Sequence, residues 1–507
     1  AFEEAGFKGA FRVEMRPANV HPLDARYNVI NWVHRSTRGW STGDAIIDPR
    51  TGEIIKGVVT LGSLRVRQDY LIAEGLLAPY AKGDLEVPAV REWALARLRQ
   101  LAAHEVGHTL GISHNYYDSD AGRISVMDYP HPLVTLKADG SLDSSGVYAR
   151  GLGAWDKIAI AWGYQDFPPG TDESRALGAI LDDGFKRDLR YMTNQDMAAH
   201  PRVDWWSNGT DAAAELVRML EVRRAALARF GENAIRRGRP MATLEEALVP
   251  LYLHHRYQVE AAASVLGGQY YTYAMRGDGR EPTRPAPAGE QKAALDALLR
   301  TLDPAVLRLP DTVLKAIPPR PDGYGPHREL FPRYTGPVFD AIAPAVVAAD
   351  HTLTQLLDPE RAARLVEQKA LDPSLPGLDD VLERLVARAA TAAPGSPYEA
   401  EIRRAVERVV AERLMGLAGG ARMAQVRALA SDALQALART SGTVSDGRPE
   451  SAHASLLAQD IRRFLERPAA PWTSPASPAI PPGPPIGEPA LDYLRALEPF
   501  CSRESER

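Results

Sequence analysis

Five residues within one short stretch carry the chemistry that this sequence can perform. The segment from 104 to 114 reads H-E-x-x-H-x-x-G-x-x-H. His104 and His108 are four residues apart, so on a helix their rings lie on one face and can bind the same ion. Gly111 can adopt a positive φ that ends the helix and turns the chain back, so that His114 approaches as a third ligand. Three neutral imidazoles leave a fourth position on zinc open for water, which is the catalytic arrangement.

Glu105 adds the group that hydrolysis at a metal requires. It follows the first histidine directly, turned by about 100° around a helix axis, where its carboxylate can hold a water molecule that the ion also binds. The alternative is a helix whose histidines have this spacing by coincidence. The glycine and the third histidine bring the fixed positions to five, so a chance match in 507 residues has odds of about one in ten thousand. The motif therefore predicts one catalytic Zn²⁺ ion.

A methionine and a tyrosine follow the motif in the segment Ser125–Pro130, which reads S-V-M-D-Y-P. The histidine motif followed by such a methionine resembles the metzincin clan of zinc endopeptidases, in which a Met turn lies beneath the metal. The resemblance implies that Met127 packs under the three imidazoles as a hydrophobic floor without binding the ion. Tyr129 matches the tyrosine that astacins and serralysins use to stabilise the oxyanion. A packing role alone for Tyr129 stays open.

The residue after the third histidine separates this sequence from the better-defined metzincin families. Matrixins, serralysins and adamalysins usually have Ser, Pro and Asp there, whereas this sequence has Asn115. More of the chain resembles the large bacterial zinc-dependent metalloproteases of the Met-zincin type, closely over the first third and loosely beyond it. The supporting phrases are Arg26–Ile30, Asp48–Ile54, Asn115–Tyr116, Trp155–Lys157 and Trp162–Tyr164.

The elements that must position these residues begin with a predicted sheet. Alternating or β-rich segments predict strands at Phe11–Met15 and Tyr27–Val33. Ala45–Asp48 and Ile54–Leu61 flank a turn at 49–52 and predict a hairpin. By resemblance, the arm at Gly43–Asp48 is an antiparallel edge strand that lines the cleft and pairs with a substrate peptide. A plain surface hairpin is the alternative.

Helices follow the strands and carry the motif. Helical periodicity predicts one helix at Leu64–Leu77 and a long one that starts at Pro88 and runs into the motif with its apolar face on the sheet. Leu133–Tyr148 is predicted to be an exposed loop. Gly153–Tyr164 matches the closing helix of the clan. Residues 1–205 are thus predicted to form an α+β, metzincin-like zinc protease domain with a mixed twisted sheet, an active-site helix and a Met turn.

The character of the sequence changes after residue 205. Ala, Leu and Arg dominate in helical periods, which predicts a mostly α-helical region over residues 206–467. Pro- and Gly-rich breaks separate its helices, without the fixed period of a repeat array. The expected helices are Asp211–Phe230, Leu244–Leu266, Gly289–Leu302, Pro359–Lys369, Leu378–Ala390, Tyr398–Leu417 and Met423–Ala438. Residues 468–507 are proline-rich and predict a flexible tail.

The beginning of the chain resembles a fragment. Residues 1–7 match only the end of the first metzincin helix, which implies that the first strand and most of that helix belong to a missing N-terminal part. We expect that part to pack on this chain and to carry any export signal, which indicates a periplasmic, cell-surface or extracellular location.

Composition excludes several partners. The net charge of −5 gives no reason to expect nucleic-acid binding. The sequence contains no apolar run of eighteen residues, so it predicts no transmembrane helix. The single cysteine, Cys501, can form no internal disulfide. No dense Asp/Asn/Gly loop indicates calcium. The expected partner is a peptide or protein substrate.

These inferences combine into one functional hypothesis. The sequence predicts a zinc-dependent endopeptidase that hydrolyses peptide bonds by a zinc-bound water, with Glu105 as general base. One alternative is a zinc amidase with a narrow, non-protein substrate range. Another is a zinc-binding protein-interaction module, which Glu105 disfavours because a structural site does not need that carboxylate.

Overall fold

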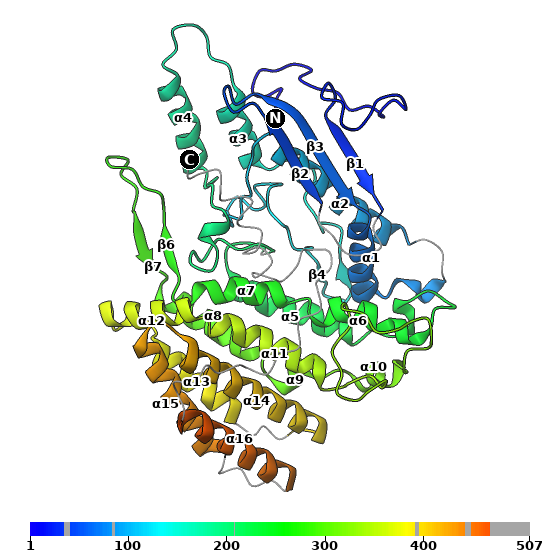
Figure 1. Ribbon diagram of the computed structural model, residues 1–507, viewed down its shortest axis with the longest axis vertical. Helices are drawn as coiled ribbons and strands as arrows, with labels where there is room; N and C mark the ends of the chain where they lie inside the picture. Colours follow the sequence, from blue (N-terminus) through cyan, green and yellow to red (C-terminus); the bar gives the residue numbers. More distant parts are fainter. Residues whose placement is uncertain (35–40, 84–86, 207, 391–394, 442–447, 467–507) are drawn as a thin grey trace.

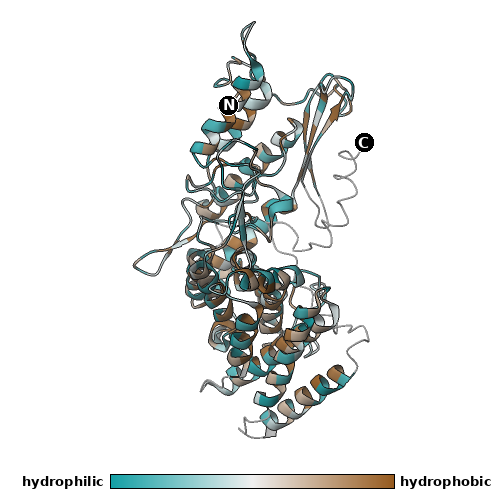
Figure 2. Ribbon diagram, turned by 90° about the vertical axis from the view of Figure 1, so that its left-hand side faces the viewer, coloured by the Kyte–Doolittle hydropathy of each residue, from teal (hydrophilic) through white to brown (hydrophobic). Residues whose placement is uncertain are grey.

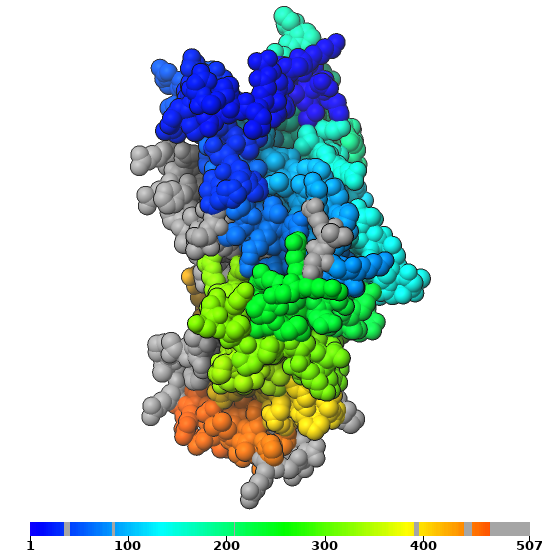
Figure 3. Space-filling model, turned by 90° about the vertical axis from the view of Figure 1, so that its right-hand side faces the viewer, coloured from blue at the N-terminus to red at the C-terminus, as the bar shows by residue number. Residues whose placement is uncertain are grey.

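The N-terminal part of the chain and the later helices lie at opposite ends of the long axis. The computed structural model describes residues 1–34, 41–83, 87–206, 208–390, 395–441 and 448–466. Figure 1 shows the strands of the N-terminal part at one end and a stack of helices at the other. Figure 3 shows the same arrangement on the surface, with blue, cyan and teal residues at one end, green in the middle and orange at the other end. The described residues form a mixed α+β fold in which helices predominate, so the predicted α+β class is confirmed.

A three-stranded mixed sheet forms the N-terminal layer. It comprises β1 (Val29–Val33), β2 (Thr42–Ile47) and β3 (Ile54–Gly62), in the order β1-β3-β2. β1 runs parallel to β3, and β2 runs antiparallel to β3. The turn between β2 and β3 is closed where Asp48 N donates to Glu53 O and Gly52 N donates to Asp48 O. The predicted hairpin is confirmed, and its first arm is an edge strand among the described residues.

The predicted strand at Phe11–Met15 is wrong. These residues form no strand, and the side chains of Phe11, Val13 and Met15 are 69%, 78% and 95% exposed. Alternation of apolar and polar residues favours an extended backbone, but a strand needs a hydrogen-bonded neighbour. No described segment pairs with this one.

Two helices connect the sheet to the motif. α1 (Leu64–Leu77) has the predicted bounds, and α2 (Pro88–Thr109) starts at the predicted proline, which occupies the first turn where no N–H is needed. α2 packs on the sheet through Leu101, which forms a buried cluster with Val59 and Leu61 of β3. The motif therefore stands on a long helix supported along one side by the sheet.

The segment after the motif contains little regular structure. A short hairpin pairs β4 (Thr135–Leu136) with β5 (Leu142–Asp143), and α3 (Ala154–Tyr164) and α4 (Glu173–Lys186) follow. The predicted exposed loop at Leu133–Tyr148 is wrong at its base, because Val134, Val147 and Tyr148 are buried in the main core. Residues 135–140 at the tip and residues 145–146 are exposed.

Helices build most of the remaining chain. They are α5 (Ala212–Leu227), α6 (Leu244–Tyr252), α7 (Arg256–Val265), α8 (Ala288–Arg300), α9 (Pro304–Leu307), α10 (Asp311–Ala316), α11 (Ala343–Leu356), α12 (Pro359–Leu371), α13 (Leu378–Ala390), α14 (Pro397–Gly420), α15 (Ala424–Ser441) and α16 (Arg448–Glu466). Figure 2 shows hydrophobic and hydrophilic residues alternating along these helices, as expected for amphipathic helices. A hairpin of β6 (Gln269–Tyr271) and β7 (Thr283–Pro285) interrupts the series.

One core spans both sides of the predicted domain boundary. The same buried cluster contains Ile72 and Trp93 of α1 and α2 and Leu216 and Leu248 of α5 and α6. The boundaries at 205 and 467 stay predictions, and the proposed tail at 468–507 lies outside the described residues. Among the described helices, none is both long enough and apolar enough to cross a bilayer.

Candidate metal centre

The end of α2 turns the chain back on itself. Gly111 has a φ of +79°, the left-handed conformation that suits glycine. The amides of Leu110 and Ile112 both donate to the carbonyl of Gly107, at 3.0 and 3.1 Å, and Gly111 N donates to His108 O at 3.0 Å. These bonds satisfy the last carbonyls of the helix and send the chain to His114.

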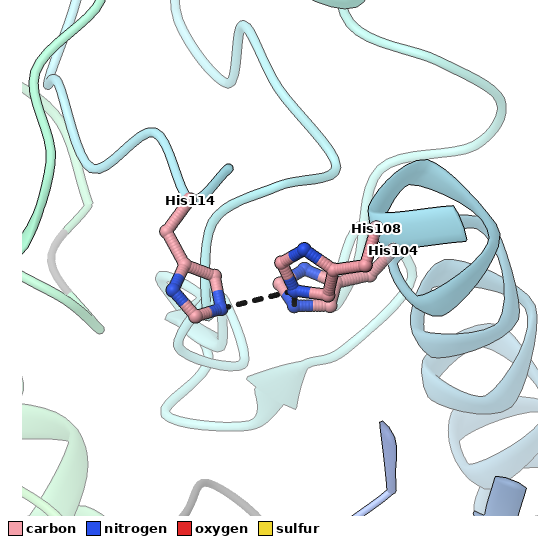
Figure 4. Close-up of side chains that lie close together, drawn as sticks. All are labelled: His104, His108 and His114. Carbon is pink, nitrogen blue, oxygen red and sulfur yellow. Dashed lines mark hydrogen bonds between the residues drawn. The ribbon is translucent and has the colours of Figure 1, made fainter. Parts of the chain in front are cut away.

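The three histidines of the motif meet at one point. Figure 4 shows His104 and His108 extending from α2 toward His114, which comes from the loop on the other side. Nε2 of His108 lies 3.1 Å from Nε2 of His104 and 3.2 Å from Nε2 of His114. Among the described residues, this is the one group of three potential ligands that could hold a metal ion. The predicted ligands are therefore brought together.

The hydrogen bonds on the other ring nitrogens suit a metal. Nδ1 of His104 donates to Val126 O at 2.8 Å, Nδ1 of His108 to Ile112 O at 2.9 Å, and Nδ1 of His114 to Asn194 Oδ1 at 3.4 Å. Each ring thus has its proton on Nδ1, which leaves the lone pair of Nε2 as the donor to an ion. A tetrahedral ion bound at about 2.0–2.1 Å needs nitrogen atoms roughly 3.3–3.4 Å apart, which is close to the spacing of 3.1 and 3.2 Å. The donor set fits zinc.

The histidines are also held in the neutral form that binds metals. Burial lowers the pKa of His104 well below its ordinary value, and the neighbouring His114 and His108 lower it further. Burial lowers the pKa of His108 as well, and it lowers the pKa of His114 to about 3. Neutral imidazoles therefore face one another at neutral pH without charge repulsion.

Glu105 lies where β2 meets α2. Its side chain is buried, and burial raises its pKa to about 7, while Arg65 and Arg97 act in the opposite direction. Gly43 of the edge strand touches the backbone of Glu105, because a Cβ atom on Gly43 would overlap its carbonyl oxygen. The carboxylate and the edge strand thus belong to the same corner of the site.

Met127 packs directly beneath the helix that carries the ligands. It is 1% exposed, and a Cβ atom on Gly107 would lie 2.3 Å from its Sδ. The loop around it is fixed from two helices. Gln100 Nε2 of α2 donates to Val126 O at 2.8 Å, and Val126 N donates to Asp156 Oδ2 of α3 at 2.9 Å. Val126 O also accepts from His104, so the loop and the first ligand are fixed together.

Tyr129 reaches the third histidine from this loop. Its hydroxyl lies 2.9 Å from Nε2 of His114. Its ring stacks on Trp206, with the centroids 4.8 Å apart and the planes inclined by 17°, and it also lies near the rings of Tyr116 and Trp205. Trp206 has a φ of +73°, a strained backbone conformation for a non-glycine residue.

Asn115, the residue that differs from other metzincins, has a structural role. It is 2% exposed. Its Nδ2 donates to Arg190 O at 2.9 Å, and its Oδ1 accepts from the amide of Met192 at 3.1 Å. The asparagine therefore joins the end of the motif to the segment around residue 190. Ser, Pro or Asp cannot make both contacts, because none of them has both an amide donor and a carbonyl acceptor in its side chain.

Sequence reasoning missed several residues that shape the site. Gln100 stands one helical turn before His104, and a buried polar residue on the apolar face of a helix is a signal that could have found it. Asp156 lies within one of the segments that resemble the family, but the resemblance assigns it no role. Asn194 and Trp206 carry no signal in the sequence, since each is brought to the site by the fold alone.

The comparisons with known proteins agree with this geometry. No curated protein and no solved structure matches the chain. A family model described as Met-zincin matches residues 86–395, which is more than half of the chain and includes all three histidines. The resemblance inferred from the motif is therefore confirmed, and the chain belongs to the Met-zincin family.

Proposed function

We propose that this protein is a zinc-dependent endopeptidase. The observation that carries the proposal is the arrangement of the three imidazoles, whose Nε2 atoms face one another while each Nδ1 donates to an oxygen. Membership of the Met-zincin family supports the same reaction class. His104, His108 and His114 would hold the ion.

The chain's own groups supply the proton transfers. Zinc, when bound, supplies the Lewis acidity that activates a water and polarises the scissile carbonyl. The Glu105 carboxylate accepts a proton from the attacking water as the new C–O bond forms, and it delivers that proton to the leaving amine as the C–N bond breaks. The Tyr129 hydroxyl donates a hydrogen bond to the oxygen that becomes negatively charged.

The surroundings of the site support a peptide substrate. β2 pairs with β3 on one side, and no other described strand pairs with its second side. A peptide in extended conformation can add to such an edge through main-chain hydrogen bonds. Because Gly43 touches Glu105, a peptide bound along this edge lies next to the proposed base. The Met127 loop beneath the histidines would act as the Met turn of the clan.

The test is cleavage of a denatured protein mixture by the wild type and by Glu105→Ala, with the zinc content of each determined. We expect equal zinc in both proteins and cleavage by the wild type alone, inhibited by a chelator. Equal cleavage by the two proteins would contradict the role of Glu105. Zinc in both with cleavage by neither would favour a binding module or a narrow substrate range.

A further inference from the structure

The third ligand is held differently from the first two. Nδ1 of His104 and of His108 donates to backbone carbonyls, those of Val126 and Ile112. Nδ1 of His114 donates instead to a side chain, the Oδ1 atom of Asn194, which is 80 residues away in the sequence. His114 also stands on a loop rather than on α2, and its ring stacks on that of Tyr116 with the centroids 5.2 Å apart. The stack fixes the plane of the ring, and the Asn194 contact is the one that Nδ1 makes within that plane.

Asn194 belongs to a short turn that a buried carboxylate keeps in shape. It opens the 3-10 helix η2 (Asn194–Asp196), and its own side chain is exposed. Asp196 closes the turn and is 1% exposed. Its Oδ2 accepts from the amide of Thr193 at 2.8 Å, which ties the carboxylate to the residue before Asn194.

The other oxygen of this carboxylate binds the β6–β7 hairpin. Asp196 Oδ1 accepts from the hydroxyl of Tyr271 at 2.9 Å and also from the hydroxyl of Tyr273. The backbone adds a further link, because Gln269 N donates to Ala199 O at 2.8 Å. Figure 1 shows the hairpin rising from the helical part of the chain toward the part that carries the motif. The helical region thus reaches the metal site through this hairpin.

We propose that Asn194 is a positioning residue that fixes the ring orientation and tautomer of His114, and that the β6–β7 hairpin keeps Asn194 in place through Asp196. The inference rests on the proposed zinc site and gives part of the helical region a role in it. Partners that orient a metal-bound histidine typically change metal affinity about 10- to 100-fold when they are removed.

The test measures the dissociation constant for Zn²⁺ alone, by competition with a chromophoric chelator on the metal-free full chain. Asn194→Ala removes the acceptor, and we expect weaker binding by about 10- to 100-fold. Asn194→Asp keeps an oxygen acceptor for Nδ1, so it should retain affinity close to that of the wild type. Because Asn194 is exposed, both variants should keep the circular dichroism and melting temperature of the wild type.

The hairpin offers a matched pair of variants. Tyr271→Phe/Tyr273→Phe removes the two hydroxyls that bind Asp196, and we expect it to weaken zinc binding in the same direction by a smaller factor. Tyr270→Phe removes a hydroxyl from the same strand that bonds Glu290 at 2.7 Å instead, so zinc affinity should not change.

Each outcome decides a separate point. Zinc binding by Asn194→Ala that equals the wild type, or by Asn194→Asp that is as weak as Asn194→Ala, would overturn the role of Asn194. An effect of Asn194→Ala without an effect of the tyrosine pair would overturn the role of the hairpin. A wild type that binds no zinc would overturn the proposed function together with this inference.

Discussion

A Cβ atom on Gly43 would lie 1.9 Å from the carbonyl oxygen of Glu105, so β2 and α2 meet through their backbones at the residue that carries the proposed catalytic carboxylate. No side chain separates the edge strand from the helix at this point. The relative position of the strand and of Glu105 is therefore set by main-chain contact. A substitution at Gly43 should therefore lower both the free energy of unfolding and the rate of catalysis.

Gly43→Ala should destabilise the protein and reduce kcat/KM. The methyl group has no room, so β2 must move away from α2, and overpacking of this kind costs about 1–3 kcal/mol. Denaturant unfolding and peptide cleavage measure the two effects. Gly178→Ala in α4 is the control, because a Cβ atom there meets no atom within 4 Å. Equal stability of Gly43→Ala and the wild type would contradict the close contact.

Local patterns explain why much of the fold could be predicted. α1 and α13 have the bounds that periodicity indicates, and α2 begins at the predicted Pro88. The hairpin of β2 and β3 follows from a turn sequence between two apolar runs. The histidine motif places its own ligands, since helical spacing and one glycine turn are enough to bring them together.

The predictions that were wrong depend on properties that a local sequence pattern does not contain, such as the presence of a neighbouring strand. Phe11–Met15 alternates as a strand does, but it has no partner among the described strands. The segment Leu244–Leu266 has one continuous helical period, yet α6 ends at Tyr252 and α7 starts at Arg256. Pro250 lies within the last turn of α6 and lacks the N–H that a continuing helix uses.

The supporting residues of the site were the least predictable. Asn194 contacts His114 across 80 positions of the sequence. Trp206 stacks on Tyr129 across 77 positions (206 − 129). Neither residue lies in a motif, and both are brought to the site by the packing of the later helices and the hairpin. Chemistry that depends on such long-range contacts requires the folded chain.

Gly107 and Met127 should behave as a coupled pair. Gly107→Ala places a methyl group against Met127 Sδ, whereas Met127→Ala leaves a cavity that costs about 2–5 kcal/mol. In the double variant, the added methyl group occupies part of that cavity. In a double-mutant cycle, the loss of unfolding free energy in the double variant should therefore be smaller than the sum of the two single losses, by a coupling of about 0.5–3 kcal/mol. Strict additivity would show that the two residues do not touch.

Tyr129→Phe should lower kcat while zinc affinity stays the same. The phenylalanine ring keeps the stack on Trp206, and only the hydroxyl near His114 is lost. Loss of one donor to a developing oxyanion typically costs about 10²- to 10³-fold in kcat. Steady-state kinetics and zinc titration measure the two quantities. Tyr80→Phe is the control, because its hydroxyl bonds Glu74 instead. An unchanged kcat would leave Tyr129 with a packing role alone.

Asp69 should make the stability of the protein depend on pH. It is buried on α1, where Trp93 Nε1 and the Tyr148 hydroxyl donate to its Oδ1 at 3.1 and 3.0 Å. Burial raises its pKa from the ordinary 3.8 to about 7, although Arg97 and other neighbours oppose the shift. Between these pH values the folded chain keeps a proton that the unfolded chain releases. The free energy of unfolding that this group contributes therefore falls as pH rises through this window and is constant above it.

Asp69→Asn removes this titration but keeps an oxygen acceptor for Trp93 and Tyr148. The free energy of unfolding of the wild type minus that of the variant should decrease between pH 4 and pH 7, by on the order of 1.4 kcal/mol for each unit of pKa shift. Urea unfolding at pH 4, 5.5, 7 and 8 provides the measurement. A difference that stays flat or rises over this range would mean that Asp69 is ionised in the folded protein, with Arg97 as the neighbour that stabilises its charge.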